Sequence, residues 1–326
     1  MAFPAGIVDA LDPARLRLLV AVDREGSISA AAEACGVGQP SATKQLKALE
    51  AAVGEKLVER DGRASRLTPA GELVVSRAAR VLASLEGLEE ELAALRGAET
   101  GTLALAVSTT TGTYVMPSIL RCFADRHPGV DVDIAIGSSA WVAERVSKRE
   151  FPVGIAGETE FPGGVRAEPF LDDELVGIAA PGKLAVEGGR ARTSELERST
   201  LLVREPGSST RMVAERHLAR AGCHPANRWE LDSNEAIKRS VRAGLGVGFV
   251  SRLAVEDEVD RGELTSFRID GGEPIHRSIY LVLPDDREPT PAESAFIATL
   301  SDCCAVTISG CAVDGAAGRV ADAPTP

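Results

Sequence analysis

Polar and cationic side chains gather on one face of a short predicted helix that begins near residue 39. Apolar side chains recur in this helix at Ala42, Leu46 and Leu49, the i, i+4, i+7 spacing of a buried face. The opposite face carries Gln39, Ser41, Thr43, Lys44 and Lys47. Amide, hydroxyl and ammonium groups on side chains of this length bind base edges and phosphates in the major groove of DNA. The chemistry that these residues could perform is therefore recognition of a DNA sequence.

A helix–turn–helix pattern would position this face. Ser29 is the predicted N-cap of a first helix over residues 30–35, and Gly-Val-Gly at 36–38 ends that helix. Pro40 falls in the first turn of the second helix, where its missing N–H had no partner to lose. An ordinary helical hairpin with a solvated lysine face would fit the same pattern. The residues that follow decide between these two interpretations.

Two short predicted strands around a Gly62-Arg63 tip form a wing, and the motif Leu-Thr-Pro-Ala-Gly at 67–71 then starts a further helix. The stretch 11–95 resembles the N-terminal domain of the LysR-type transcriptional regulators, except that Gly38 stands where the family commonly has a serine N-cap. The resemblance implies that residues 1–68 are a winged helix-turn-helix DNA-binding domain. Gln39, Ser41 and Thr43 are the predicted base readers. The full set of predicted DNA contacts is Gln39, Pro40, Ser41, Thr43, Lys44, Lys47, Arg60, Arg63 and Arg66, with Lys44, Lys47, Arg63 and Arg66 mostly on phosphates.

The net charge of the 326-residue chain is −12, which by itself argues against a nucleic-acid partner. Between Gly38 and Arg66, however, six lysines and arginines stand against four acidic residues, so this module is locally basic. The charge of the contacting module is the relevant quantity when one small module makes the contact. The acidity elsewhere should weaken non-specific DNA binding and favour site selection.

Composition and motifs predict a cytoplasmic protein that is not an enzyme. The hydrophobic fraction of 44% and the charged fraction of 26% are typical of soluble globular proteins. We find no signal-peptide pattern and no apolar stretch that suits a membrane span. Six cysteines without Cys-x-x-Cys spacing and only four histidines predict no metal site, no disulfide scaffold and reduced thiols. Without a Gly-x-Ser-x-Gly, His-Glu-x-x-His or phosphate-loop motif, we predict no catalytic residues and no cofactor.

A long helix is predicted from Pro69 to Arg96. Its apolar residues alternate at spacings of four and three over three heptads, as in a coiled coil. This seam consists of Val74, Ala78, Val81, Leu85, Leu88, Leu92 and Leu95. The seam could pack on its own chain, but a dimer would place two recognition helices on successive turns of DNA. We therefore predict a linker and dimerisation helix over 69–97, and the resemblance implies antiparallel pairing in homodimers that usually form homotetramers.

Short apolar strands alternate with helices from residue 101 to residue 300, which predicts βαβ units and a largely parallel sheet. Two α/β subdomains with a crevice between them are expected. The first consists of about 101–171 and 272–300, and the second of about 172–271. The crevice is the expected ligand site, because ligands bind at the carboxyl ends of such strands. Over 98–300 the pattern resembles the LysR-type effector-binding domain, which has the periplasmic-binding-protein fold. The predicted fold class is α+β overall: an N-terminal winged helix-turn-helix, a long linker helix and a C-terminal α/β effector domain of two subdomains.

Two predicted loop–helix junctions carry groups that bind anions. Residues 108–113 follow the first strand of the effector domain, and residues 205–211 open a helix in the second subdomain. Hydroxyls and free backbone N–H groups would therefore converge at positive helix ends. Arg211 adds a planar cation suited to carboxylate or phosphate. As an alternative, the serines and threonines only cap their helices.

Residues 140–142, 204–211 and 233–238 resemble the LysR subgroup that contains the Calvin-cycle regulators. Effectors in that subgroup include phosphorylated metabolites, nicotinamide nucleotides and inorganic anions. The resemblance implies that a small, anionic effector contacts Ser108, Thr109, Thr110, Gly137, Ser138, Gly207, Ser209 and Arg211. Phe-Pro-Val at 151–153 and Ser209 depart from the family pattern near this site, so the identity of the effector does not transfer from a relative.

Other interpretations stay open at this point. Residues 101–300 would also suit a solute-binding transport component or an enzyme with an incidental helix-turn-helix. The glycines at 244, 246 and 248 resemble a dinucleotide fingerprint, but they precede a strand and more readily turn a helix into that strand. Residues 301–326 match nothing in the family pattern and are predicted to be a disordered tail. Cys303, Cys304 and Cys311 could instead form a redox or metal device there.

Overall fold

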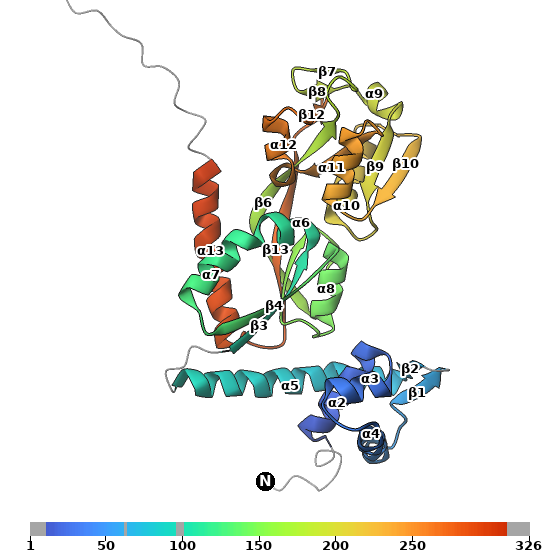
Figure 1. Ribbon diagram of the computed structural model, residues 1–326, viewed down its shortest axis with the longest axis vertical. Helices are drawn as coiled ribbons and strands as arrows, with labels where there is room; N and C mark the ends of the chain where they lie inside the picture. Colours follow the sequence, from blue (N-terminus) through green and yellow to red (C-terminus); the bar gives the residue numbers. More distant parts are fainter. Residues whose placement is uncertain (1–10, 62–63, 96–100, 312–326) are drawn as a thin grey trace, which may run out of the picture. The chain divides into compact units, whose positions relative to one another are not determined.

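The computed structural model describes residues 11–61, 64–95 and 101–311 (Figure 1). The chain divides into an N-terminal unit that reaches Gly97 and a C-terminal unit that holds nearly all of the remainder. Residues 1–10, Arg63 at the predicted wing tip and residues 312–326 of the predicted tail lie outside the described residues. For Arg60 and Leu95 the structure describes the backbone but not the side chain.

The N-terminal unit begins with three short helices, α2 (Pro13–Glu25), α3 (Ile28–Ala34) and α4 (Gln39–Val53). Asp12 caps α2 by accepting a hydrogen bond from the backbone N–H of Ala14. Ser27, and not Ser29 as the sequence suggested, caps α3, since its hydroxyl accepts from the N–H of Ala30 at 3.2 Å. The earlier start lets Ile28 pack against the core of this unit. The predicted helix–turn–helix is present.

A two-stranded wing follows, in which β1 (Val58–Asp61) pairs antiparallel with β2 (Ala64–Leu67). Thr68 then joins the wing to the helix α5 (Pro69–Leu95): its hydroxyl donates to the carbonyl of Lys56 at 2.6 Å and accepts from the N–H of Gly71 at 3.0 Å. A Cβ at position 71 would collide with the carbonyl oxygen of Leu57. The threonine and glycine of the Leu-Thr-Pro-Ala-Gly motif therefore fix where α5 leaves the wing.

Helix α5 uses its predicted apolar seam in two different ways. Ala78 is 2% exposed and packs with Leu82 on Leu16 of α2, and Val74 packs against the core beneath α4. Ala78 and Val74 therefore pack within the chain, the first buried and the second partly buried. A four-three spacing alone does not say which surface the seam meets. By contrast, Val81, Leu88 and Leu92 are 48%, 50% and 45% exposed. Leu85 is half-buried.

The C-terminal unit is built on one large sheet with helices around it (Figure 1). Its strand order is β10-β9-β11-β6-β13-β5-β3-β4, with β12 paired to β6 and the small β7–β8 hairpin attached through β12. The strands are β3 (Gly101–Ser108), β4 (Val130–Gly137), β5 (Val153–Gly157), β6 (Val165–Ala179), β7 (Val186–Glu187), β8 (Arg190–Ala191), β9 (Thr200–Arg204), β10 (Asn227–Leu231), β11 (Val247–Ser251), β12 (Thr265–Ile269) and β13 (Ile275–Pro284). The helices are α6 (Thr109–Tyr114), α7 (Met116–Arg126), α8 (Ser139–Ser147), α9 (Thr193–Glu197), α10 (Ser209–Arg220), α11 (Asn234–Arg242), α12 (Glu256–Asp260) and α13 (Pro291–Cys311), with a 3-10 turn η1 at Arg252–Ala254.

Separate hydrophobic cores define two subdomains in this unit. The first subdomain packs β3, β5, α7 and α13 around Phe123 and Phe296, whose rings meet edge to face at 5.7 Å. The second packs β9, β11 and α10 around Phe249 and Phe267, in the same geometry at 5.9 Å. Strands β3, β4 and β5 are mutually parallel, and so are β9, β10 and β11. The predicted α/β architecture is confirmed.

Strands β6 and β13 run through both subdomains as an antiparallel pair from Val165 to Leu175. Where the pair passes between the cores, Arg277 of β13 forms a buried ion pair with Asp173 of β6 at 2.7 Å. Arg277 also donates to the hydroxyl of Thr210 at 2.8 Å, and Asp173 accepts from Ser251 at 2.7 Å. This network joins the crossing strands to α10 and β11.

In this unit the sequence left several elements unpredicted, and it placed one boundary wrongly. Strand β10 was not predicted, because four of its five residues are exposed and show no alternation. The short helix α6, which precedes α7, was not predicted as an element of its own. The terminal helix α13 continues to Cys311, past the predicted boundary at 300, because the sequence has no proline or glycine there before Gly310. Among the described residues, no helix is both long and apolar enough to span a membrane.

Gly38 at the N-cap of α4 offers a test of how this helix begins. Its φ of −68° suits any residue, it gives no side-chain cap, and a Cβ there would meet only the Pro40 ring, at 3.8 Å. Gly38→Ser should stabilise α4 by about 0.5 kcal/mol, since a serine hydroxyl can accept from a first-turn N–H. We expect slower amide hydrogen exchange in α4 of the full chain. Gly54→Ser, at a φ of +81°, should instead speed exchange. Equal effects of the two changes would contradict this account.

Candidate functional site

The polar face of α4 lies in solvent, as predicted. Ala42, Leu46 and Leu49 are at most 4% exposed, whereas the other face holds exposed side chains and the half-buried Thr43. The Thr43 hydroxyl donates back to the carbonyl of Gln39 at 3.0 Å. The exposed residues among the predicted contacts are Gln39, Pro40, Ser41, Lys44, Lys47 and, on the wing strand β2, Arg66. The helix thus presents amide, hydroxyl and ammonium groups on one surface.

In the C-terminal unit, the carboxyl ends of β3 and β4 meet at the first predicted junction. Ser108 and Thr110 are 6% and 5% exposed. The Ser108 hydroxyl shares a hydrogen bond with Thr111 at 3.0 Å, and Thr109 donates to the carbonyl oxygen of Gly137 at 3.0 Å. This part of the site is a layer of buried hydroxyls over the strand ends.

The second junction contacts the first subdomain directly. The backbone N–H of Ala140 donates to the carbonyl oxygen of Gly207 at 3.1 Å, which joins α8 to the loop before α10. Gly207 has a φ of +81°, and a Cβ on it would lie 3.0 Å from both Ser138 and Ala140. A Cβ on Gly157, at the end of β5, would lie 2.7 Å from Ser209. Both glycines therefore permit the close approach of the two subdomains.

Ser209, at the first turn of the twelve-residue helix α10, is the least satisfied polar group at this junction. It is 3% exposed, and its hydroxyl has no hydrogen-bond partner. A buried hydroxyl without a partner costs about 1–3 kcal/mol. This side chain lies at the positive end of α10, where an anion would be stabilised. The Ser209 hydroxyl is therefore a buried donor without an acceptor in the first turn of α10.

The structure does not bring Arg211 to these residues. Its guanidinium forms hydrogen bonds with Glu230 at 2.7 Å, Glu215 at 3.2 Å and the carbonyl oxygen of Arg204 at 3.0 Å. The hydrogen bond to Glu230 and the charge of Glu215 raise the pKa of Arg211 above its ordinary value despite partial burial. Glu230 thus ties this cation to β10, a strand that the sequence did not predict, and Glu215 holds it along α10.

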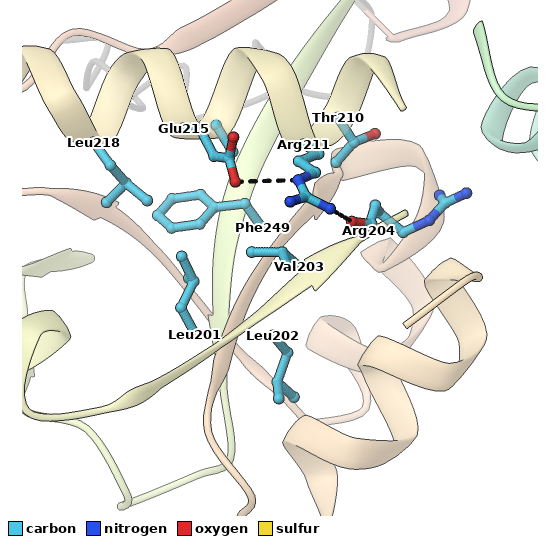
Figure 2. A pocket seen from close by; sticks show the side chains of 10 residues that line it. Leu201, Leu202, Val203, Arg204, Thr210, Arg211, Glu215, Leu218 and Phe249 are labelled. Carbon is cyan, nitrogen blue, oxygen red and sulfur yellow. Dashed lines mark hydrogen bonds and ion pairs between the residues drawn. The ribbon is translucent and has the colours of Figure 1, made fainter. Parts of the chain in front are cut away.

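Figure 2 shows Arg211 above a small cavity, turned toward Glu215 and the backbone of Arg204. Apolar side chains of β9, α10 and β11, including Leu218 and Phe249, line this cavity. Its volume of about 10 Å³ is at the lower limit for one water molecule. The cavity is therefore too small to hold a metabolite.

A second set of contacts joins α6 of the first subdomain to α11 of the second. The Tyr114 hydroxyl donates to Glu235 at 3.0 Å, and the Lys238 ammonium contacts Glu235 at 2.6 Å and Glu258 at 2.8 Å. Burial alone would raise the pKa of Glu235, but hydrogen bonds from Lys238 and Tyr114 outweigh it and hold the pKa below its ordinary value. Across the unit, Arg216 of α10 pairs with Glu158 at 2.6 Å. Charged contacts therefore hold the subdomains together on two sides.

Two family models match the chain. A model for the bacterial regulatory helix-turn-helix protein of the LysR family covers residues 13–72, and one for the LysR substrate-binding domain covers residues 96–305. The chain belongs to the LysR family of transcriptional regulators. The recognition from sequence is confirmed, and so is the fold.

Individual relatives place this LysR-type regulator near the Calvin-cycle subgroup. It is 34% identical to the RuBisCO operon transcriptional regulator of Acidithiobacillus ferrooxidans, over 87% of this chain and 91% of the relative. Its relatives are regulators and not enzymes. Among solved structures it is similar to full-length OxyR of Pseudomonas aeruginosa, with 23% identity, a TM-score of 0.71 and coverage of 90% and 94%. It is also similar to the regulatory domain of Synechocystis PCC6803 CcmR in complex with 2-PG, with 30% identity, a TM-score of 0.58 and coverage of 63% and 98%.

Sequence reasoning missed the residues that connect the two junctions of this LysR-type regulator. Asn234 donates to the Thr110 hydroxyl at 3.0 Å and accepts from Arg204 at 2.8 Å. Tyr114 and Glu235 form the contact between α6 and α11. Asn234 directly follows the helix cap Ser233. Because Ser233 alone caps the helix, a second polar residue beside it was a signal for another role. Nothing in the sequence separated Tyr114 from an ordinary core tyrosine.

The depressed pKa of Glu235 predicts a pH dependence. A glutamate whose pKa is lower in the folded chain stabilises the fold above its unfolded pKa of about 4.3, and this contribution is lost as pH falls through the folded pKa. Glu235→Gln should therefore lower the melting temperature at pH 7 and make no difference well below pH 4. Thermal denaturation of both chains across this range measures it. A constant difference at every pH would exclude this role for the Glu235 charge.

Proposed function

We propose that this protein is a sequence-specific, DNA-binding transcriptional regulator controlled by a small anionic metabolite that binds between the two effector subdomains. For DNA, the support is the exposed face of α4 together with the family membership. Base contacts come from Gln39, Ser41 and Thr43. Phosphate contacts come mainly from Lys44, Lys47, Arg63 and Arg66, and Pro40 and Arg60 complete the proposed set. The protein acts in the cytoplasm, where its promoter DNA is.

We propose further that α5 pairs with the same helix of a second copy. Three apolar seam residues, Val81, Leu88 and Leu92, are about half exposed within the chain. Leu73 adds a 61% exposed apolar side chain on the same helix. Exposed apolar residues in a row mark an interaction surface. A homodimer, and a homotetramer built from it, would cover these residues and hold two copies of α4 on one DNA duplex.

The observation that carries the effector half of the proposal is the buried, unpartnered hydroxyl of Ser209 at the positive end of α10. An oxyanion would supply the missing acceptor and complement the helix dipole. The CcmR regulatory domain, 30% identical to this chain, is known in complex with 2-PG, which supports a small anion. The proposed contacts are Ser108, Thr109, Thr110, Gly137, Ser138, Gly207 and Ser209. Arg211 would need to leave Glu230 to join them.

Effector binding would act through subdomain closure. An anion that contacts both junctions favours the state in which they approach, and it shifts the population toward that state by its difference in affinity. In an oligomer this shift changes the spacing of the winged modules. A changed spacing alters the DNA bend that the protein can stabilise, and hence transcription from the promoter.

DNA binding by the α4 face can be tested through its salt dependence. Lys44→Ala should weaken binding to all duplexes alike and reduce the slope of log affinity against log salt by about 0.9, because one phosphate contact is lost. Ser41→Ala should change base preference instead. The measurement uses the full chain and a duplex selected from random sequence. Lys183→Ala, an exposed lysine of the C-terminal unit, is the charge control. A slope unchanged by Lys44→Ala would remove this residue from the DNA interface.

The anion site can be tested by calorimetry on the full chain with 2-PG, inorganic phosphate and sulfate. Ser209→Ala should weaken the anion that binds best by about tenfold or more, the effect of losing one hydrogen bond to a charged group. Ser199→Ala, a hydroxyl before β9 that donates to Glu195, is the matched control and should leave affinity unchanged. Anion binding that survives Ser209→Ala would move the site elsewhere. Binding of uncharged compounds alone would refute anionic control.

A further inference from the structure

Asn234 stands at the centre of a buried chain of hydrogen bonds that crosses between the two subdomains. Glu205 binds the Arg204 guanidinium through both carboxylate oxygens, at 2.7 and 2.8 Å. Arg204 donates to the side-chain oxygen of Asn234 at 2.8 Å. The Asn234 amide nitrogen then donates to the hydroxyl oxygen of Thr110, on α6 of the first subdomain, at 3.0 Å. Arg204, Asn234 and Thr110 are at most 5% exposed, so water does not compete for these bonds.

The direction of every bond in this chain is fixed. A guanidinium has donors only, so the Asn234 oxygen must face Arg204 and its NH₂ group must face Thr110. The Thr110 oxygen is then an acceptor, and its own proton is left to donate elsewhere. Among the described residues, no acceptor for that proton is found. Thr110 therefore lies at the end of the chain with an unused donor.

We propose that Asn234 is a positioning residue that orients the Thr110 hydroxyl as a hydrogen-bond donor toward the effector. This inference rests on the proposed function and narrows its ligand class. The junction would favour carboxylate, sulfate or phosphate oxygens at Thr110 over an ammonium or amide N–H, because only an acceptor pairs with the hydroxyl proton that Asn234 leaves unused.

The charges around the junction show why the direction of the hydroxyl matters. Each arginine near it is already paired: Arg204 with Glu205, Arg211 with Glu230 and Arg277 with Asp173. Selection for an anion would therefore rest on neutral donors, at Thr110 from one subdomain and at Ser209 from the other. Neutral donors select an acceptor only if their protons point at it, and Asn234 secures this for Thr110.

A double-mutant cycle on effector affinity tests the inference. Asn234→Ala, Thr110→Val and the double variant are made in the full chain, and calorimetry gives the dissociation constant of each for 2-PG and for sulfate. Each single change should weaken binding about tenfold. In the Thr110→Val background, Asn234→Ala should add less than about twofold, because it acts through Thr110. A merely structural role would leave the two effects additive.

Asn234→Asp gives an isosteric test that preserves the packing. Aspartate would accept the Thr110 proton and turn that hydroxyl away from the ligand, so anion affinity should fall by more than in Asn234→Ala. Asn227→Asp, at an exposed position on β10, carries the same charge change and should have little effect. If the wild type binds an anion and Asn234→Ala binds it equally well, the role of Asn234 is refuted and the effector site stands. If the wild type binds none of the anions, both proposals fail.

Discussion

The C-terminal unit depends on the buried ion pair between Arg277 and Asp173. Both charges lie away from water, where a lone charge is very costly, so neither strand can move without the other. The pair locks β6 to β13 where they pass between the two cores, and its hydrogen bonds to Thr210 and Ser251 extend the lock to α10 and β11. Through Thr210, the pair is joined to the first turn of α10, in which Ser209 lies.

The candidate site follows from that constraint and from parallel strands. Strands that run in parallel end together, so Ser108 and Gly137 come to one edge of the sheet and the loops before α10 and α11 come to another. Glycines at 157 and 207 let the two edges touch. Because carboxylates pair with the nearby Arg204 and Arg211, hydroxyl and amide groups would determine which ligand fits the proposed site.

Local periodicity at Ala42, Leu46 and Leu49 was enough to predict the recognition helix. The wing and the Leu-Thr-Pro-Ala-Gly motif that follow distinguished a winged helix-turn-helix from an ordinary helical hairpin. The same spacing did not predict which seam residues of α5 pack within the chain and which stay exposed. Ala78 and Val81 are both apolar seam residues, and only the position of α2 buries the first of them. The side-chain partners of Arg211 were also beyond prediction. They include Glu230 on β10, an exposed strand without alternation, and depend on a pairing between distant parts of the chain. Asn234 was missed for the same reason, since Thr110 is far from it in sequence.

The packing of α5 on α2 divides that helix into an anchored part and a projecting part. Ala78 and Leu82 fasten its first turns to the domain that carries α4, whereas the stretch from residue 83 to residue 95 extends about 20 Å further. A straight helix resists bending over this distance. Because Leu82 packs on Leu16 of α2, tilting the far end of α5 would therefore turn α4 together with α5 as one rigid body. A small displacement at the far end of α5 would therefore also displace the exposed polar face of α4.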